Sequence, residues 1–218
     1  MVVIVAILLS LAATLLQPAQ ERNLEIEKKK SMLQSIRIDA TRQNTVELYS
    51  KYITESCVLN YKGDTVPGVD AFNVVLRNEQ KKPLRDQYLP LFKATGADGQ
   101  KVIIVPVEGK GLWGPIWGYV ALESDLNTIY GVTFDHKGET PGLGAEINTP
   151  RFESMFPGKK LFEDGNFVSI QVIKGGAAQG DVHGVDAISG GTITSKGLQN
   201  MLFDCISKYL DYFKKIKS

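Results

Sequence analysis

The stretch 186-DAISGGTITSKGLQNMLFDCISKYLDYF-213 joins a run of small residues to an amphipathic segment. Apolar side chains recur there every three or four positions, which predicts a helix over residues 196–215 with one face buried in the protein. Lysines gather towards the end of this segment, where the helix dipole favours cations. The apolar stripe consists of Leu198, Met201, Leu202, Cys205, Ile206, Tyr209, Leu210 and Phe213.

The small residues before this helix leave their backbone N–H groups unshielded. A helix N-terminus with free amides suits a phosphate group, because the positive end of the helix dipole lies there. The other interpretation is a flexible turn that ends in a capped helix, with Thr194 or Ser195 as the cap. The segment is not a Walker A loop, since Lys196 precedes Gly197 and no Gly-Lys-Ser/Thr triplet forms. It is not a nucleophile elbow either, since Gly-x-Ser-x-Gly is absent.

The middle of the chain changes to the pattern of β-strands. Strands are predicted over residues 102–107, 118–124, 129–135 and 167–174, with glycine-rich connections between them. Helices are predicted earlier, over residues 21–39 and 45–57, whereas residues 74–100 are polar and fit neither pattern. We therefore expect an α+β fold, in which a central sheet has flanking helices.

Two further glycine-rich segments lie beside these strands. The segment 136-HKGETPGLG-144 contains a Pro-Gly turn, and its glycines would let a flat ligand approach the backbone closely. The segment 108-EGKGLWGPIWG-118 places two tryptophans among glycines, a pattern that serves ligands or partners in exposed loops. The alternatives are a plain hairpin turn for the first segment and a tryptophan that covers the end of a sheet for the second.

The N-terminal residues are uncharged and almost all apolar from Met1 to Leu16, and the first charged residue is Glu21. A helix over residues 1–20 would be roughly 30 Å long, about the thickness of a bilayer core. A signal peptide would need a basic start, and a soluble core helix would not be apolar on every face. We therefore expect a transmembrane anchor over residues 1–20 and one soluble domain over residues 21–218. Whether further residues precede Met1 is left open. The charges after the anchor are mixed and weakly favour a cytoplasmic domain by the positive-inside rule.

Composition excludes several classes of function. A net charge of +1 without a basic stripe argues against nucleic-acid binding. Cys57, Cys205, His136 and His183 are too far apart in sequence to form a zinc or iron–sulfur motif, so no metal site is expected. A Cys57–Cys205 disulfide is left open.

Three of these observations together resemble a known family. The pattern Asp186-x-x-Ser189-Gly190-x-Thr192 before a helix is similar to the target of a flavin transferase that esterifies FMN phosphate onto threonine. With the segment 139–144, it resembles the FMN-binding domain shared by the NqrC component of the Na+-translocating NADH:quinone oxidoreductase and the equivalent component of the Rnf complex. The Gly-Lys-Gly-Leu-Trp-Gly-Pro segment is more similar to the former. One departure is Gly191, where the usual motif has alanine.

The resemblance implies residue roles, with the specific motifs lying between residues 102 and 213. FMN would be bound covalently through a phosphoester to Thr192, which is an attachment point and not a catalytic residue. Asp186, Ser189 and Gly190 would be recognised by the flavin transferase. The other residues implied to contact the flavin or its phosphate are Leu112, Trp113, Glu139, Thr140, Gly142, Leu143, Ser189, Gly190, Gly191 and Thr194.

The resemblance also implies a place in the cell. The chain would be a single-pass subunit of an inner-membrane complex that couples NADH and ubiquinone chemistry to sodium transport, with no active site of its own. Its domain would lie on the extracytoplasmic, periplasmic side, against the weak charge-based orientation. Partners would be the other subunits, the flavin transferase and the membrane. The alternatives are the equivalent electron-transport component of the Rnf type and a flavin-free, membrane-tethered assembly module.

Overall fold

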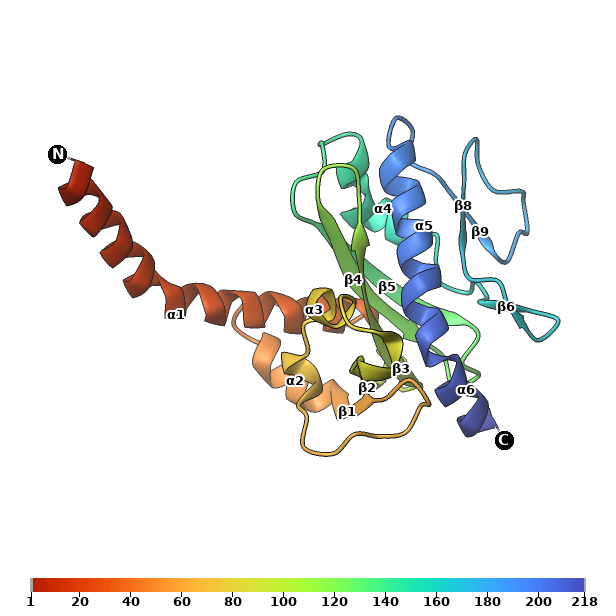
Figure 1. Ribbon diagram of the computed structural model, residues 1–218. Helices are drawn as coiled ribbons and strands as arrows, with labels where there is room; N and C mark the ends of the chain where they lie inside the picture. Colours follow the sequence, from red (N-terminus) through yellow and green to blue (C-terminus); the bar gives the residue numbers. More distant parts are fainter. Residues whose placement is uncertain (1, 218) are drawn as a thin grey trace.

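Helix α1 (Val2–Ser35) begins the chain in the computed structural model, which describes residues 2–217. Its first part projects away from the rest of the molecule and bends about midway (Figure 1), and Pro18 lies inside the helix. By length and composition this helix can cross a membrane, as the predicted anchor requires. One helix runs through residue 20 without a break, so a domain boundary at that position stays a prediction.

A five-stranded antiparallel sheet forms the centre of the fold. Its strands follow one another in chain order, so each pairs with its neighbour in sequence. Helix α2 (Thr45–Tyr52) leads directly into the first strand. The strands are β1 (Ile53–Leu59), β2 (Leu89–Thr95), β3 (Lys101–Lys110), β4 (Pro115–Leu122) and β5 (Ile129–His136).

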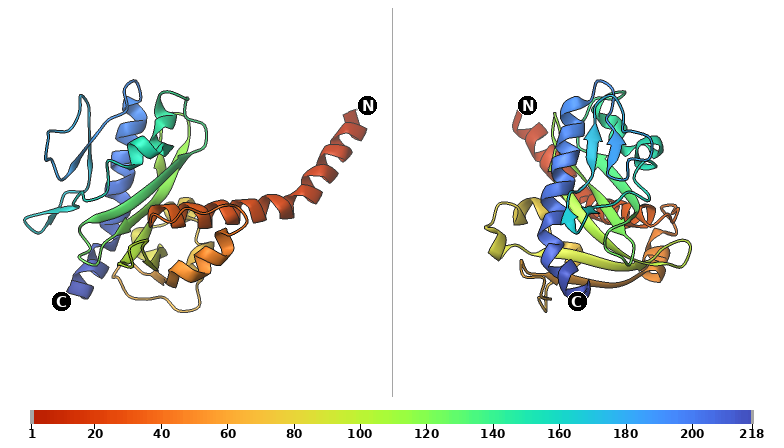
Figure 2. Two further views of the ribbon diagram at one scale, coloured as in Figure 1. Left: turned by 180° about the vertical axis from the view of Figure 1, so that it is seen from behind. Right: turned by 90° about the vertical axis from the view of Figure 1, so that its right-hand side faces the viewer.

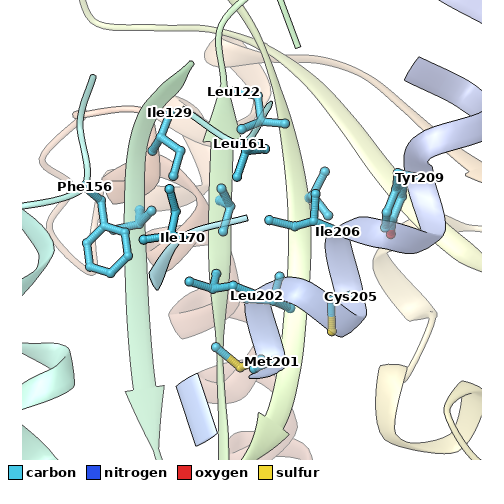
Figure 3. Close-up of a cluster of buried hydrophobic side chains, with 14 of the residues drawn as sticks. Leu122, Ile129, Phe156, Leu161, Ile170, Met201, Leu202, Cys205, Ile206 and Tyr209 are labelled. Atoms are coloured by element: carbon cyan, nitrogen blue, oxygen red, sulfur yellow. The ribbon is translucent and has the colours of Figure 1, made fainter. Parts of the chain in front are cut away.

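Helix α5 (Thr192–Ile206) covers one face of this sheet, packing mainly on β3 (Figures 1 and 2). Its apolar stripe points at the strands, as the periodicity predicted. Figure 3 shows Leu202 and Ile206 beside side chains of the sheet and of the segments that follow it, and Met201 and Cys205 belong to the same buried cluster. The chain then continues through η4 (Ser207–Tyr209) into α6 (Leu210–Lys217).

The end of α1 covers the opposite face of the sheet. Leu33 and Ile36 are fully buried there, in a second apolar cluster. Backbone contact is close, because a Cβ atom at Gly131 of β5 would overlap the carbonyl oxygen of Ser35. The Thr133 hydroxyl donates to the carbonyl of Ser31 at 3.0 Å. The helix that leaves the predicted anchor is thus also part of the domain's core.

The remaining elements are short and lie in the connections. The elements η1, α3 and η2 link β1 to β2, and η3 and α4 follow β5. Strands β6 and β7 form an antiparallel pair, whereas β8 and β9 pair in parallel and lead to α5. Their bounds are η1 (Ala71–Asn73), α3 (Leu76–Glu79), η2 (Leu84–Asp86), η3 (Gly144–Asn148), α4 (Pro150–Glu153), β6 (Phe162–Glu163), β7 (Asn166–Phe167), β8 (Gln171–Ile173) and β9 (Gly184–Asp186).

The predicted α+β class, with a central sheet and flanking helices, is confirmed. The strands predicted over residues 102–107, 118–124 and 129–135 correspond to β3, β4 and β5. Their apolar character on both faces follows from the helices that cover both sides of the sheet.

Several predicted boundaries are wrong. The helix expected over residues 45–57 ends at Tyr52, because the β-branched residues that follow pair with β2. Residues 74–100, which fitted no pattern, contain β2. The strand expected over residues 167–174 is reduced to β8 and the end of β7, since Ser169 has a positive φ of 58°. Helix α5 begins at Thr192, four residues before the predicted start.

The docking of α1 predicts a stability effect in the full chain. Leu33→Ala should lower the free energy of unfolding by about 2–5 kcal/mol, because it removes a fully buried side chain and leaves a cavity. Leu24→Ala on the same helix is the matched control, since Leu24 is 66% exposed, and it should change stability by less than about 0.5 kcal/mol. Denaturant unfolding in detergent measures both, and equal effects would contradict this packing.

Candidate functional site

The three glycine-rich segments of the sequence meet at one end of the sheet, the upper end in Figure 1. They are the β3–β4 turn, the loop after β5 and the beginning of α5. The side chain of Glu139 connects all three. One carboxylate oxygen, Oε1, accepts the N–H of Trp113 at 2.8 Å, and the other, Oε2, accepts the hydroxyl of Thr194 at 2.5 Å.

Glu139 is only 4% exposed, and two glycines make room for it. A Cβ atom at Gly111 would lie 2.5 Å from its Oε1. A Cβ atom at Gly144 would lie 2.5 Å from Thr194 Oγ1 and closer still to Glu139 Oε2. Glu139 and Thr194 therefore shape the site from beneath its surface, with their polar atoms engaged by the protein.

The first turn of α5 has no side-chain cap. Gly191 is the N-cap residue, and the helix begins at Thr192. The interpretation of Thr194 or Ser195 as the cap is wrong, because both lie inside the helix and their hydroxyls bind elsewhere. Ser195 Oγ accepts the N–H of Ile188 at 3.1 Å. Since the first N–H groups of a helix have no partner within it, the positive end of α5 remains available at Thr192.

Thr192 is exposed, and its hydroxyl has no hydrogen-bond partner among residues 2–217. The three segments bring exposed apolar side chains to the same end of the sheet. Trp113 is the most exposed of them, at 68%. Exposed apolar groups of this kind mark sites for ligands or partners. We call these side chains the apolar rim, which consists of Leu112, Trp113, Leu143 and Ile193.

Two glycines beside Thr192 have close neighbours. Gly190 has a φ of 73°, and a Cβ atom there would lie 2.5 Å from Leu143 Cδ2. At Gly191, a Cβ atom would lie 2.9 Å from Ile188 Cγ2. The departure from alanine at residue 191 thus fits the bulk of Ile188 in this chain.

The residues predicted for transferase recognition lie at the surface. Asp186, Ser189 and Gly190 are all exposed. Asp186 Oδ1 accepts the N–H of Ala177 at 2.8 Å, which ties the loop between β8 and β9 to the motif. The predicted contact residues Thr140 and Gly142 are also exposed, in the loop after β5.

The histidines have structural partners, and the cysteines are not paired with each other. His136 Nδ1 accepts the N–H of Glu139 at 3.1 Å, and His183 Nδ1 pairs with the carbonyl of Lys160 at 2.7 Å. Both cysteines are free thiols, with Cys205 buried, and burial raises its pKa. Within the part of the chain that the structure describes, no group of three potential metal-ligating side chains forms.

Sequence reasoning missed Ile193 and the packing role of Ile188. Ile193 was detectable as an apolar residue outside the helical stripe, next to the predicted attachment site. The burial of Glu139 left no signal in the sequence, because it depends on segments far apart along the chain.

Comparison with known proteins agrees with this geometry. A family model described as an FMN-binding domain matches residues 111–207, which include the β3–β4 turn, the loop after β5 and α5. NqrC components of the Na(+)-translocating NADH-quinone reductase are similar over most of the chain. Those of Vibrio vulnificus and Haemophilus ducreyi are each 35% identical, over 89% and 90% of this chain and 82% of each relative.

Two solved structures are similar in fold as well. The crystal structure of the NqrC component from Parabacteroides distasonis has a TM-score of 0.83 and 42% identity, over 91% of this chain and 96% of that one. The crystal structure of NqrC from Shewanella oneidensis has a TM-score of 0.77 and 30% identity, over 91% and 99%.

Fold and site together define the class of this protein as a single FMN-binding domain with an apolar N-terminal helix. The sequence identity to the relatives, and the share of the chain that it covers, also define the family. The chain belongs to the NqrC family, whose members are components of the Na(+)-translocating NADH-quinone reductase.

One ionisable group packed against β5 has a strongly shifted pKa. Burial raises the pKa of Glu153, in α4, to about 7; the N–H of Phe134, which donates to it at 2.8 Å, opposes this, and the nearby charge of Asp135 adds to it.

Glu153 predicts a pH-dependent stability. Between its ordinary pKa of 4.5 and the folded value of about 7, the folded state holds a proton that the unfolded state has lost. Raising the pH through this window should therefore lower stability. Glu153→Gln, which stays neutral and can still accept from Phe134, should flatten this dependence and raise the melting temperature at pH 8 relative to wild type. If the melting temperature changed by the same amount between pH 5 and pH 8 in wild type and in Glu153→Gln, the assignment would be wrong.

Proposed function

We propose that this chain is an electron-transfer subunit of a Na+-translocating NADH-quinone reductase and carries FMN in a phosphoester bond to Thr192. One observation supports the attachment most directly. The Thr192 hydroxyl is exposed and, among residues 2–217, without a partner, at the uncapped first turn of α5 and beside the apolar rim. A phosphate on this hydroxyl lies at the positive end of a helix.

The residues present fit the chemistry of FMN. The apolar rim offers side chains for a flat aromatic ring, among them an indole that can stack on it. Gly190 is exposed, so the backbone just before Thr192 is accessible to a phosphate. Roles for Thr140 and Gly142 at the ring stay predictions that agree with their exposure.

Attachment has a defined chemical balance. A bond forms between Thr192 Oγ1 and the flavin phosphorus, the hydroxyl proton leaves, and a bond from phosphorus to a leaving group breaks. Condensation with FMN itself would have to release water, so the donor is an activated flavin phosphate with a phosphoanhydride bond. The flavin transferase moves the flavin phosphate from that donor to Thr192, and the other half of the anhydride leaves as a phosphate monoester. The exposed motif residues Asp186, Ser189 and Gly190 are the recognition site of the transferase.

Bound FMN supplies reversible electron transfer, and the chain's residues hold it in place. Thr192 prevents dissociation. The apolar rim keeps water from one side of the ring while leaving it at the edge of the domain, where partner subunits reach it. No proton transfer by His136 or His183 is required, in agreement with their structural hydrogen bonds.

Membership of this family also supports our proposals for membrane attachment and for partner subunits. The relatives are named as subunits of a reductase, which supports assembly of this chain with further subunits of such a complex. The exposed apolar half of α1 supports an anchor in the inner membrane. We place the domain on the extracytoplasmic side, as the family resemblance implies.

The attachment site predicts the result of a substitution. Thr192→Val keeps the shape of the side chain but removes the hydroxyl, so coexpression with the flavin transferase should leave no fluorescent flavin band on a denaturing gel. Thr65→Val, at an exposed threonine outside the predicted site, should keep the band. A band that persists in Thr192→Val would place the ester elsewhere, and a colourless wild-type protein would favour the flavin-free module.

The orientation is tested by thiol labelling. In a Cys57→Ser background, where Cys205 is buried, the exposed residue Lys137 is replaced by cysteine. A membrane-impermeant maleimide should label Lys137→Cys in intact cells with a permeabilised outer membrane, and fail to label it in everted vesicles. The Cys57→Ser parent without the added cysteine is the blank. Labelling in everted vesicles but not in intact cells would show that the domain lies on the cytoplasmic side.

A further inference from the structure

We propose that Glu139 and Thr194 are positioning residues, whose hydrogen bond presents the Thr192 hydroxyl for flavin attachment and holds Trp113 beside it. This inference rests on the proposed function, since it concerns how the same site is prepared. It assigns Glu139 a role beneath the flavin site in place of a contact on its surface.

The first step of the argument is the weakness of the helix start. The N-cap residue Gly191 offers no side chain, and the first N–H groups of α5 lack partners within the helix. Uncapped helix ends fray unless tertiary contacts hold them. Thr194 provides such a contact through its bond to Glu139, because it is 1% exposed and its hydroxyl lies 2.5 Å from the carboxylate.

The second step is geometrical. Successive residues of a helix are separated by about 100°, so residues two apart point about 200° apart. Anchoring Thr194 inward therefore directs Thr192 outward, as their burial and exposure indicate. The negative charge of a carboxylate near the first turn also stabilises the helix start through its dipole.

The third step connects the helix to the apolar rim. The same carboxylate accepts the N–H of Trp113, so the β3–β4 turn and α5 are held by one side chain. Gly111 and Gly144 lie directly against the carboxylate, because a Cβ atom at either position would overlap one of its oxygens. Loosening the Thr194 bond should therefore loosen Trp113 as well as Thr192.

The test compares Thr194→Val with Thr194→Ser in the full chain. Valine keeps the shape and removes the hydroxyl, whereas serine keeps the hydroxyl. Thr133→Val is the matched control, since Thr133 is also a buried threonine but bonds to Ser31 on the opposite face of the sheet. All variants carry Trp117→Phe, so that Trp113 is the only fluorescent tryptophan.

Two quantities are measured. In flavin-free protein, iodide quenching and anisotropy of Trp113 report the mobility of the β3–β4 turn without any cofactor. With limiting flavin transferase, intact mass gives the initial rate of attachment. Thr194→Val should make Trp113 more mobile and slow attachment about tenfold, the effect of losing a buried hydrogen bond to a charged acceptor. Thr194→Ser and Thr133→Val should remain within about threefold of wild type.

A glycine pair keeps the proposal testable if Thr194→Val does not fold. Gly144→Ala should force Glu139 and Thr194 apart and reproduce the effects of Thr194→Val. Gly138→Ala lies in the same loop, where an added Cβ atom meets nothing within 4 Å, and should leave both readouts unchanged.

Wild-type mobility of Trp113 and wild-type attachment rates in both Thr194→Val and Gly144→Ala would overturn the proposal. That result would leave the proposed function intact. A wild-type chain that takes no flavin would instead overturn the proposed function, while the Trp113 measurements would still decide whether Glu139 and Thr194 order the site.

Discussion

The buried carboxylate of Glu139 is the constraint on which the site depends. It accepts hydrogen bonds from Trp113 and Thr194, which belong to a turn and a helix far apart in sequence. A buried carboxylate without such partners would be strongly destabilising, so the bonds stabilise both the site and the fold around it. This carboxylate requires glycine at residues 111 and 144, since the Cβ atom of any larger residue would overlap its oxygens.

Sequence periodicity was sufficient for the elements that pack with regular faces. Helix α5 and strands β3 to β5 were predictable because their apolar residues recur with a helical period or form long β-branched runs. Strands β1 and β2 were not, because their strand state depends on pairing with each other across a long connection. The helix predicted over residues 45–57 ran past the end of α2 into β1 for the same reason.

The candidate site was predictable in part and for a different reason. Its three glycine-rich segments were recognised by their residues, and the resemblance grouped them before any geometry was known. The separate roles of residues within them were not predictable. Thr192 and Thr194 are the same residue type two positions apart, yet one faces solvent and the other is buried against Glu139. Only the tertiary structure distinguishes them.

Helix α1 has a consequence for how the domain can move. Within residues 2–36, no flexible linker separates its exposed apolar half from Leu33 and Ile36, which pack into the core. Where that half sits in a bilayer, the domain cannot reorient independently of the membrane-embedded helix. It would instead tilt together with the membrane-spanning half of the helix, so one continuous helix restricts its orientation relative to the lipid surface.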